Sequence, residues 1–259
     1  MRLLFPCDPF NKSAVDENYI DEWHAAAAIG VACSLFSFED FEDGVFRPRP
    51  ALAAGETIVY RGWMLRPGRY AALVDACAAQ GAKSLTSAAQ YRHCHYLPEW
   101  YAVCAGATPE TVFTARDADF VAAVAGKDWP AYFVKDYVKS LSSTRGSVAD
   151  TPQDIASVVD LIEQYRGEIE GGVCIRRYEQ LLHDTEERYF VWHGRAHGRD
   201  GSVPALVAAV AARIDSPFFS IDVVSSATGQ LRLIELGDGQ VSDRKHWPAA
   251  RFLAMLAQD

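Results

Sequence analysis

The first third of the chain alternates between short apolar runs and longer amphipathic stretches. The apolar runs predict three strands, RLLFP (2–6), VACSLF (31–36) and TIVYRGWML (57–65). The stretches between and after them predict two helices, over residues 16–30 and 69–82. In the first helix Tyr19, Ile20 and Trp23 share a face, and Gly30 and Gly81 are typical helix stops. Alternating strands and helices predict a small sheet covered by helices.

The middle of the chain contains its clearest helix. In TPQDIASVVDLIEQYRG (151–167), Thr151 can cap the helix, Pro152 suits its first turn and Asp154 has the capping-box spacing. A buried stripe follows at helical spacing, formed by Ile155, Val158, Val159 and Ile162. The runs at 108–114 and 131–140 predict strands, and the small polar residues 140–150 predict a loop.

The last third is rich in strands, interrupted by a helix at 204–214. Strand-like runs are GVCIRRYEQLL (172–182), ERYFVWHG (187–194), FFSIDVV (218–224) and LRLIELG (231–237). Thr228, Gly229 and Gln230 form a plausible hairpin turn between the last two runs. That hairpin would bring Asp222 and Glu235 near each other.

Composition restricts the class of protein. The chain has 259 residues, 49% of them hydrophobic, so a substantial core can form. The net charge of −9 argues against a protein that coats nucleic acid, since such a protein needs clustered Lys and Arg. The six cysteines contain no CxxC pair, the apolar start is too short for a signal peptide, and no apolar run is long enough to cross a membrane. We therefore expect a cytoplasmic protein that acts on neither membranes nor nucleic acids.

Acidic residues in apolar strands are the main chemical signal. Asp222 interrupts FFSIDVV, and Glu235 and Asp238 follow each other in IELGDGQVSD. A buried carboxylate is costly unless it is paired or binds a cation. Magnesium takes oxygen ligands, often one or two carboxylates together with phosphates and water. Surface acids on the solvated side of a sheet are the alternative.

The basic residues are weaker signals when taken singly. Lys135 and Lys139 lie four residues apart, Arg176 and Arg177 interrupt one strand, and Arg188 opens another. Phosphates are bound by charges of this kind, although solvated lysines at a strand end are the commoner case. The pair His93 and His95, which flanks Cys94, has no further ligands at zinc spacing. Asp8 and Arg61, after predicted strands, are hypothetical residues for an acceptor substrate.

The order of these motifs resembles the ATP-grasp superfamily of ATP-dependent carboxylate ligases. FVKDYVKS, CIRRYEQ, EERYFVWHG and ELGDGQVSD, together with YRGWML and SAAQYRHCHYLPEW, are similar to one poorly characterised bacterial subfamily. The resemblance covers roughly residues 90–245. It implies an α/β (α+β) protein with an ATP-grasp fold, in which residues 1–88 form a β/α pre-ATP-grasp domain and residues 89–259 the ATP-grasp domain. Within the latter it implies a lid-like subdomain at about 105–172 and a metal and nucleotide subdomain at about 173–259.

The resemblance also implies roles for single residues. Lys135 and Lys139 would contact the phosphates of ATP, and the backbone from Cys174 to Glu179, with Arg176, Arg177 and Tyr178, would be the hinge that binds adenine. Arg188 would face the transferred phosphate or the acyl phosphate, so Arg188 and Lys139 are the candidate catalytic residues. Asp222 and Glu235 would hold Mg²⁺. Most members have an asparagine two residues after this glutamate, where this chain has Gly237, and Asp238 would replace it if the strand breaks at Gly237.

The activity that the resemblance implies is an ATP- and Mg²⁺-dependent ligation of a small carboxylate to an amine or a thiol through an acyl phosphate. The amine could be an amino acid or a peptide. Two alternatives stay open: a nucleotide-binding interaction protein without turnover, and a phosphotransferase. Neither the substrates nor the oligomeric state follow from the sequence.

Overall fold

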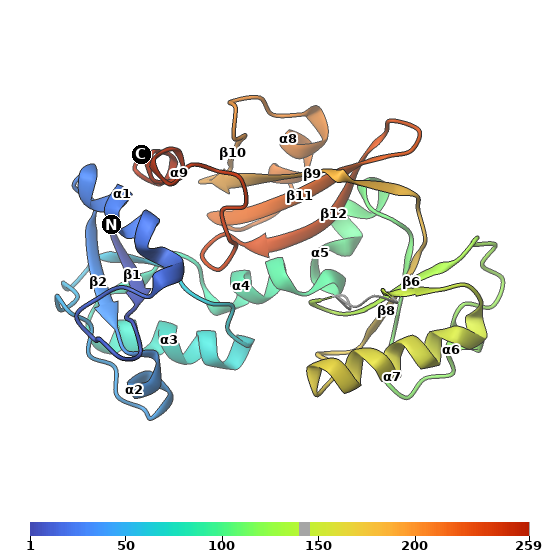
Figure 1. Ribbon diagram of the computed structural model, residues 1–259, viewed down its shortest axis with the longest axis horizontal. Coiled ribbons are helices and arrows are strands. Elements are labelled where there is room, and N and C mark those ends of the chain that lie inside the picture. The colour runs from blue at the N-terminus through green and yellow to red at the C-terminus, as the bar shows by residue number, and fades with distance from the viewer. Residues whose placement is uncertain (140–145, 259) are drawn as a thin grey trace. The chain divides into compact units, whose positions relative to one another are not determined.

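The computed structural model describes residues 1–139 and 146–258, which contain three four-stranded sheets (Figure 1). The chain divides into two compact units. Unit 1 comprises Met1–Arg92, Arg188–Ile221 and Gly237–Asp259, and unit 2 comprises His93–Glu187 and Asp222–Leu236. The predicted α/β class is confirmed, since strands and helices alternate through both units.

Unit 1 begins with a parallel sheet in the strand order β2-β1-β3-β4. Its elements are β1 (Arg2–Pro6), α1 (Ile20–Ala28), β2 (Ala32–Phe36), α2 (Phe38–Glu42), β3 (Thr57–Tyr60), α3 (Pro67–Ala79) and β4 (Lys83–Ser84). A 3₁₀ turn at Glu17–Tyr19 precedes α1. The three predicted strands and two predicted helices are confirmed, although β3 ends at Tyr60, before the predicted end of that run. Gly30 and Gly81 have positive φ angles of 73° and 79°, which suits glycine after a helix.

The segment after Thr86 is helical, and no helix was predicted there from the sequence. It forms α4 (Ala88–His95) and α5 (Leu97–Cys104), followed by a 3₁₀ turn at Ala105–Ala107. The buried residues of this segment, Tyr91, Cys94, Leu97 and Trp100, recur every three positions. The polar residues between them obscured this helical pattern in the sequence.

Unit 2 is built on an antiparallel sheet in the order β5-β8-β6-β7. Its elements are β5 (Thr111–Thr114), α6 (Phe120–Ala123), β6 (Tyr132–Asp136), β7 (Val148–Ala149), α7 (Ile155–Arg166) and β8 (Val173–Arg177). The predicted loop at 140–150 falls partly outside the described residues, at 140–145, and β7 forms within its remainder.

Helix α7 lies along one face of β6 and β8 (Figure 1). The predicted capping box is present, because the Thr151 hydroxyl donates to the Asp154 carboxylate and the Asp154 carboxylate also accepts from the Thr151 backbone N–H. The predicted stripe Ile155, Val158, Val159 and Ile162 is fully buried and packs against Val134 and Ile175 of the sheet. The helix ends at Gly167, whose φ angle is 84°.

Four of the remaining elements form the third sheet, in the order β10-β9-β11-β12. These strands are β9 (Leu181–Trp192), β10 (Arg195–His197), β11 (Phe218–Ser226) and β12 (Leu231–Asp238), and two helices accompany them, α8 (Ala205–Ala211) and α9 (Ala249–Leu256). Strands β9, β11 and β12 contribute residues to both units. The compact units therefore do not follow the predicted consecutive domains, and the predicted limits at 88 and within 89–259 stay a prediction.

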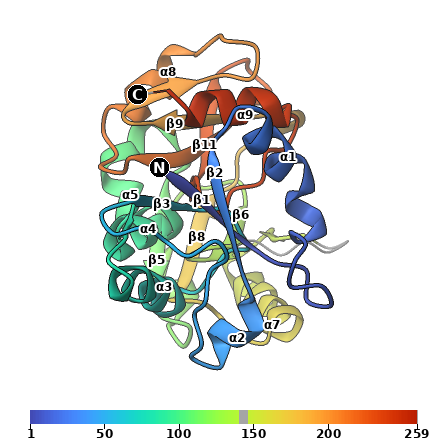
Figure 2. The same ribbon diagram turned by 90° about the vertical axis from the view of Figure 1, so that its left-hand side faces the viewer.

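Two clusters form the core of unit 1. In the first, Phe5 of β1 and Ala26 of α1 pack with Phe252 and Leu253 of α9, so α1 and α9 lie side by side (Figure 2). The second covers the other face of the parallel sheet and includes Leu4, Tyr70 and Tyr91. Helix α9 was not predicted from the sequence, although its buried residues follow helical spacing.

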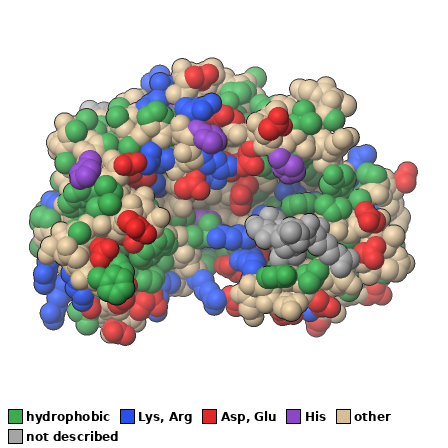
Figure 3. Space-filling model, in the orientation of Figure 1, with side chains coloured by type: hydrophobic (Ala, Val, Ile, Leu, Met, Phe, Trp, Pro, Cys, Tyr) green, Lys and Arg blue, Asp and Glu red, His purple; other side chains and the backbone are tan. Residues whose placement is uncertain are grey.

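The surface carries mixed charges. Basic and acidic side chains are interspersed over the face seen in Figure 3. No helix in the described part of the chain is long and apolar enough to cross a membrane.

Candidate nucleotide site

One face of the unit 2 sheet carries a lysine and an arginine. Phe133 of β6 lies opposite Arg176 of β8, and Lys135 follows two residues later. Directly opposite residues of an antiparallel pair share a face, so Lys135 and Arg176 lie on the same side of the sheet. Val134 and Ile175 point to the other side, toward α7. The two cations therefore lie on the face that α7 leaves uncovered.

Lys135 meets Glu235 on this face. The Lys135 Nζ lies 3.9 Å from Oε1 of Glu235 and donates a hydrogen bond of 3.0 Å to the backbone oxygen of Val138. The side chain of Lys135 is 7% exposed and that of Glu235 is 44% exposed. An ammonium has three N–H donors, so the contact with Val138 leaves donors for an anion beside Glu235.

Asp222 and Glu235 lie on the neighbouring strands β11 and β12. The predicted hairpin is confirmed: the backbone N–H of Ser226 donates to Gln230 at 2.8 Å, and Gly229 has a φ angle of 81°. Asp222 is buried, at 2% exposure. Among residues 1–139 and 146–258, no group of three or more His, Cys, Asp or Glu side chains could hold a metal ion. A pair of carboxylates still fits the donor set of magnesium, whose other ligands are phosphate oxygens and water.

Comparisons with known proteins agree with the motifs and the fold described above. The family model "ATP-grasp domain, R2K clade family 3" matches residues 83–256. This chain belongs to that ATP-grasp family. No curated protein matches the sequence.

Solved ATP-grasp structures share the fold at low sequence identity. The D-cycloserine synthetase DcsG has a TM-score of 0.63 and 18% identity, over 99% of both chains. A RimK domain ATP-grasp protein from Sphaerobacter thermophilus has a TM-score of 0.61 and 16% identity, over 99% of this chain and 100% of that chain. The D-alanine–D-alanine ligase from Coxiella burnetii has a TM-score of 0.61 and 13% identity, over 99% of this chain and 94% of that chain. These likenesses show the ATP-grasp fold, including the β/α unit outside the family model.

The residues of the predicted adenine hinge, Cys174 to Glu179, lie in β8 and directly after it. Cys174 and Arg176 lie in the middle of β8, where β5 and β6 pair with its backbone on both sides. The backbone N–H of Arg177 donates to the backbone oxygen of Glu110, and that of Tyr178 donates to the backbone oxygen of Ala131. Among the described residues no partner accepts the backbone N–H of Glu179, so Glu179 is the residue of the predicted hinge whose backbone N–H can donate to a ligand.

A pocket of about 520 Å³ lies within unit 2. Its lining includes Arg177, Tyr178 and Glu179 of the predicted hinge, and the turn between β11 and β12. The Glu179 carboxylate forms two hydrogen bonds of 2.8 Å with Arg232, so its side chain is already paired. The volume lies within the usual range of small-molecule sites.

Lys139 lies at the end of a turn that the Asp136 carboxylate closes. The Asp136 carboxylate accepts from the backbone N–H groups of Val138 and Lys139, at 2.8 and 2.6 Å, and also pairs with Arg166. Asp136 is fully buried, whereas Lys139 is exposed. An Asp that closes a turn two or three residues later is a recognisable local signal. The turn fixes the backbone of Lys139 directly after the strand that carries Lys135.

Arg176 has partners that differ from those expected of a nucleotide ligand. Its Nη1 donates to the backbone oxygen of Ile234 at 3.1 Å, and its Nη2 donates to the hydroxyl of Thr108. The same hydroxyl donates to the backbone oxygen of Leu233 at 2.8 Å. Burial lowers the pKa of Arg176 to about 10. Arg176 and Thr108 therefore hold β12 immediately before Glu235, and nothing in the sequence around Thr108 pointed to this role.

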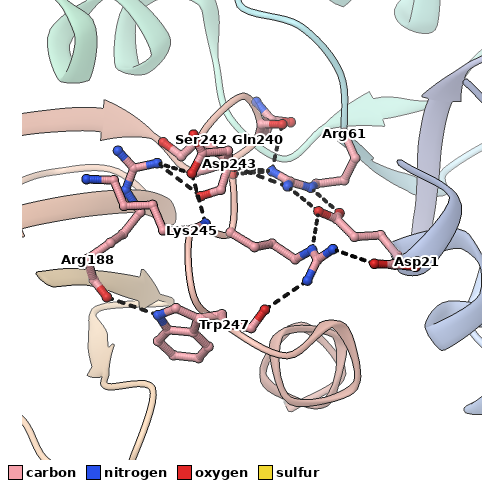
Figure 4. A network of polar contacts seen from close by, with 11 residues as sticks. Asp21, Arg61, Arg188, Gln240, Ser242, Asp243, Lys245 and Trp247 are labelled. Carbon is pink, nitrogen blue, oxygen red and sulfur yellow. Dashed lines mark hydrogen bonds and ion pairs between the residues drawn. The ribbon is translucent and has the colours of Figure 1, made fainter. Parts of the chain in front are cut away.

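Arg188 and Asp238 belong to unit 1. Arg188 Nη1 donates to the carboxylate of Asp243 at 3.1 Å and to its backbone oxygen at 3.0 Å (Figure 4). The contact of Arg188 with a transferred phosphate stays a prediction.

The condition for Asp238 to replace the asparagine, a break of the strand at Gly237, is not met, because β12 continues through Gly237 to Asp238. Asp238 is fully buried, and its Oδ1 accepts from the backbone N–H and the side-chain amide of Gln240. Its Oδ2 has no hydrogen-bond partner among the described residues. Burial raises the pKa of Asp238 to about 7. This environment suits a carboxyl inside the core of unit 1 and gives no support to Asp238 as a replacement for the missing asparagine.

The two hypothetical acceptor residues also have other contacts. Arg61 is 1% exposed, and its guanidinium donates to the Glu22 carboxylate and to the backbone oxygens of Gly239, Gln240 and Ser242. Since all three of its nitrogens are engaged, Arg61 holds the C-terminal loop and does not offer a donor to a substrate. Asp8 accepts from the backbone N–H groups of Phe10 and Asn11, which closes its loop. His93, Cys94 and His95 lie at the end of α4.

Proposed function

We propose that this protein is an ATP- and Mg²⁺-dependent ligase that activates a carboxylate as an acyl phosphate and joins it to an amine or a thiol. The observation that carries the proposal is the contact of Lys135 with Glu235 on the face of the unit 2 sheet opposite α7. Membership of an ATP-grasp family supports the use of ATP. The likeness to a D-alanine–D-alanine ligase supports ligation, and a likeness to the ligase PsnB complexed with Mg and ADP supports magnesium.

Different residues of unit 2 bind different parts of the magnesium–nucleotide complex. Lys135 and Lys139 bind phosphate oxygens as point charges, and the backbone of Glu179 binds adenine. Asp222 and Glu235 hold magnesium. When bound, Mg²⁺ would neutralise the charge on the phosphate oxygens during phosphoryl transfer. Glu235 Oε1 lies 3.9 Å from the Lys135 ammonium, so this largely buried cation has a negative charge close to it.

The reaction needs no nucleophile from the protein. A carboxylate oxygen attacks the γ-phosphorus, the bond to the β-phosphate oxygen breaks, and ADP leaves. The nitrogen of an amine, or the sulfur of a thiol, then attacks the acyl carbon, and the bond to the phosphate oxygen breaks with release of inorganic phosphate. The task of the side chains is to place the reactants and to offset the negative charge.

The test measures ADP release with ATP, Mg²⁺ and panels of carboxylates and amines. We expect release that depends on the carboxylate and the amine together. With a carboxylate and hydroxylamine, a ligase yields a hydroxamate, whereas a phosphotransferase that uses a hydroxyl yields none. A complete absence of ADP release over a broad panel of amino acids and peptides would contradict ligation.

Variants connect this activity to the site. Lys135→Ala and Glu235→Gln should each lower the rate by about 100-fold or more, as for other groups that offset charge in a transition state. Lys127→Ala is the matched control, because Lys127 lies in the same unit and pairs with Glu110. If the control loses as much activity as Lys135→Ala, the assignment of Lys135 is wrong.

A second candidate function is nucleotide binding without turnover. Gly237 replaces a ligand that most ATP-grasp enzymes have, and the buried Asp238 does not compensate for it in this structure. Tight binding of ATP with Mg²⁺, with no ADP release from any substrate panel and with a protein partner recovered by pull-down, would favour this function over ligation.

A further inference from the structure

The loop between β12 and α9 holds Arg188 at two points. Arg188 Nη1 donates to the carboxylate and to the backbone oxygen of Asp243, and the Trp247 indole N–H donates to the backbone oxygen of Arg188 at 3.0 Å (Figure 4). All three residues belong to unit 1. The backbone and the guanidinium of the predicted catalytic arginine are therefore both bound by one short stretch of chain.

The carboxylate of Asp243 is fixed by its own loop. Its Oδ1 accepts from the backbone N–H of Lys245 at 2.9 Å, which closes a turn two residues long. The side chain of Arg188 is 11% exposed, whereas that of Asp243 is 77% exposed. An exposed carboxylate is held by its bonds and not by burial, so the turn decides where Asp243 meets Arg188.

A buried ion cluster holds this loop on both sides of Asp243. Before Asp243, the backbone oxygen of Ser242 accepts from Nη1 and Nη2 of Arg61, both at 3.2 Å. After Asp243, Arg244 Nε donates to the Glu22 carboxylate at 3.1 Å. The same carboxylate accepts from Arg61 Nε and Nη2, both at 2.7 Å. Glu22 of α1 is therefore the acceptor on which both flanks of Asp243 depend.

Burial makes the cluster rigid. The side chain of Arg61 is 1% exposed and that of Glu22 is 3% exposed, so water cannot replace a lost partner. Separating a buried ion pair is strongly unfavourable, because it leaves an uncompensated charge inside the protein. The cluster therefore keeps the loop ordered, and Asp243 binds Arg188 with little further loss of conformational freedom.

We propose that Asp243 and Glu22 are positioning residues for the predicted catalytic Arg188. Asp243 orients the guanidinium directly, and Glu22 acts by fixing the loop that carries Asp243. This inference rests on the proposed ligase function and on the predicted role of Arg188 at the transferred phosphate. An arginine that offsets charge during phosphoryl transfer must be held in place, since a displacement of about 1 Å can cost about 100-fold in rate.

The first experiment observes Arg188 without requiring any reaction. Nitrogen-15 NMR of the guanidinium groups gives the rate of rotation about the Cζ–Nη bonds, and Arg188→Lys identifies the signal of Arg188. Asp243→Asn keeps an oxygen that can close the turn but removes the charge. We expect rotation in Arg188 to become at least about threefold faster, because a charge-assisted hydrogen bond is roughly twice as strong as a neutral one. An unchanged rate of rotation would overturn the direct role of Asp243.

The second experiment separates positioning from nucleotide binding. In the assay of ADP release, Arg188→Ala and Asp243→Asn should each lower kcat by about tenfold or more. The KM for ATP should stay close to that of the unchanged protein, because the residues assigned to the nucleotide lie in unit 2. Asp40→Asn, which removes the exposed partner of Lys12 in unit 1, is the matched control and should change neither constant.

A double variant shows whether Asp243 acts through Arg188. In the Arg188→Ala background, Asp243→Asn should have no further effect on kcat, because its partner is already absent. An effect as large as in the unchanged protein would mean that Asp243 acts by another route. If Arg188→Ala by itself leaves kcat unchanged, the inference is wrong.

Glu22→Gln tests the buried cluster in the same two assays. It should speed the rotation of Arg188 and lower kcat, whereas Glu56→Gln should do neither. Glu56 is the matched control, because it pairs with Arg2 in the same unit at 2.8 Å. If Glu22→Gln does not fold, Arg244→Gln replaces it, since the side chain of Arg244 is 18% exposed and lies at the edge of the cluster. Rotation and kcat equal to those of Glu56→Gln would show that the cluster does not position Arg188.

The two proposals fail separately. If the unchanged protein releases ADP as expected but Asp243→Asn behaves like Asp40→Asn, the ligase function stands and the positioning role is wrong. If Asp243→Asn and Glu22→Gln speed the rotation of Arg188 but no substrate panel releases ADP, the two residues do position Arg188 and the ligase function is wrong.

Discussion

Thr108 offers the sharpest test of how the site is held together. Its hydroxyl accepts from the Arg176 guanidinium and donates to the backbone oxygen of Leu233 at 2.8 Å, two residues before Glu235. Thr108 is 1% exposed and Arg176 is 4% exposed, so water cannot replace a lost partner. Thr108→Val keeps the shape of the side chain and removes only its hydrogen bonds.

The size of the effect follows from these contacts. A hydrogen bond to a charged group contributes about 1.5–3 kcal/mol and one between neutral groups about 0.5–1.5 kcal/mol. We therefore expect Thr108→Val to lower the free energy of unfolding by about 2–4 kcal/mol, because it leaves a buried guanidinium and a carbonyl without their partner. Thr108→Ser keeps the hydroxyl and loses one methyl group, which should cost only about 1 kcal/mol.

The assay is urea denaturation of both variants, followed by measurement of ATP affinity in the presence of Mg²⁺ under conditions where they are folded. Thr228→Val, at the exposed turn of the β11–β12 hairpin, is the matched control and should change the unfolding free energy by less than about 0.5 kcal/mol. Thr108→Val should also weaken nucleotide binding more than Thr108→Ser does, since β12 carries Glu235. If Thr108→Val is as stable as Thr108→Ser, the proposed role of the Thr108–Arg176 contact is refuted.

Three further predictions concern the metal, the pH response and the longest helix of unit 2. Asp222→Asn and Glu235→Gln should each raise the Mg²⁺ concentration needed for half-maximal ATP binding by about tenfold or more, as expected for losing one of two carboxylate ligands; unchanged magnesium titrations would exclude these residues as ligands. Because burial raises the pKa of Asp238 to about 7, the folded protein retains a proton that the unfolded chain releases near pH 4. The free energy of unfolding should therefore fall as the pH rises from about 4 to about 7, and Asp238→Asn should flatten this dependence in denaturation curves measured across that range. Thr151→Ala removes the capping-box hydroxyl of α7 and should cost about 1 kcal/mol in the same denaturation assay, whereas a loss below about 0.3 kcal/mol would show that the cap contributes nothing.

The local elements could be predicted because their causes are local. The capping box of Thr151 and Asp154, the buried stripe of α7 and the turn at Gly229 depend on residues a few positions apart. The order of the lysine, arginine and acidic motifs indicated the ATP-grasp family, which the family model confirms. Helices α4 and α9 were not predicted, although the residues that they bury follow helical spacing.

What surrounds each functional side chain was decided by contacts between distant residues. Arg176 was expected at the nucleotide, yet its partners are Thr108 and Ile234, which lie 68 and 58 residues away in the chain. Arg61 was expected at a substrate, yet Glu22 and the loop after β12 occupy its donors. Asp238 was expected at a turn, yet the core of unit 1 surrounds it. Periodicity determines which face of an element is buried, but only the packing of distant segments determines which polar group covers that face. For that reason the sequence alone established the family and the candidate residues, while the tertiary structure separated the side chains that can meet a ligand from those already bound to the protein.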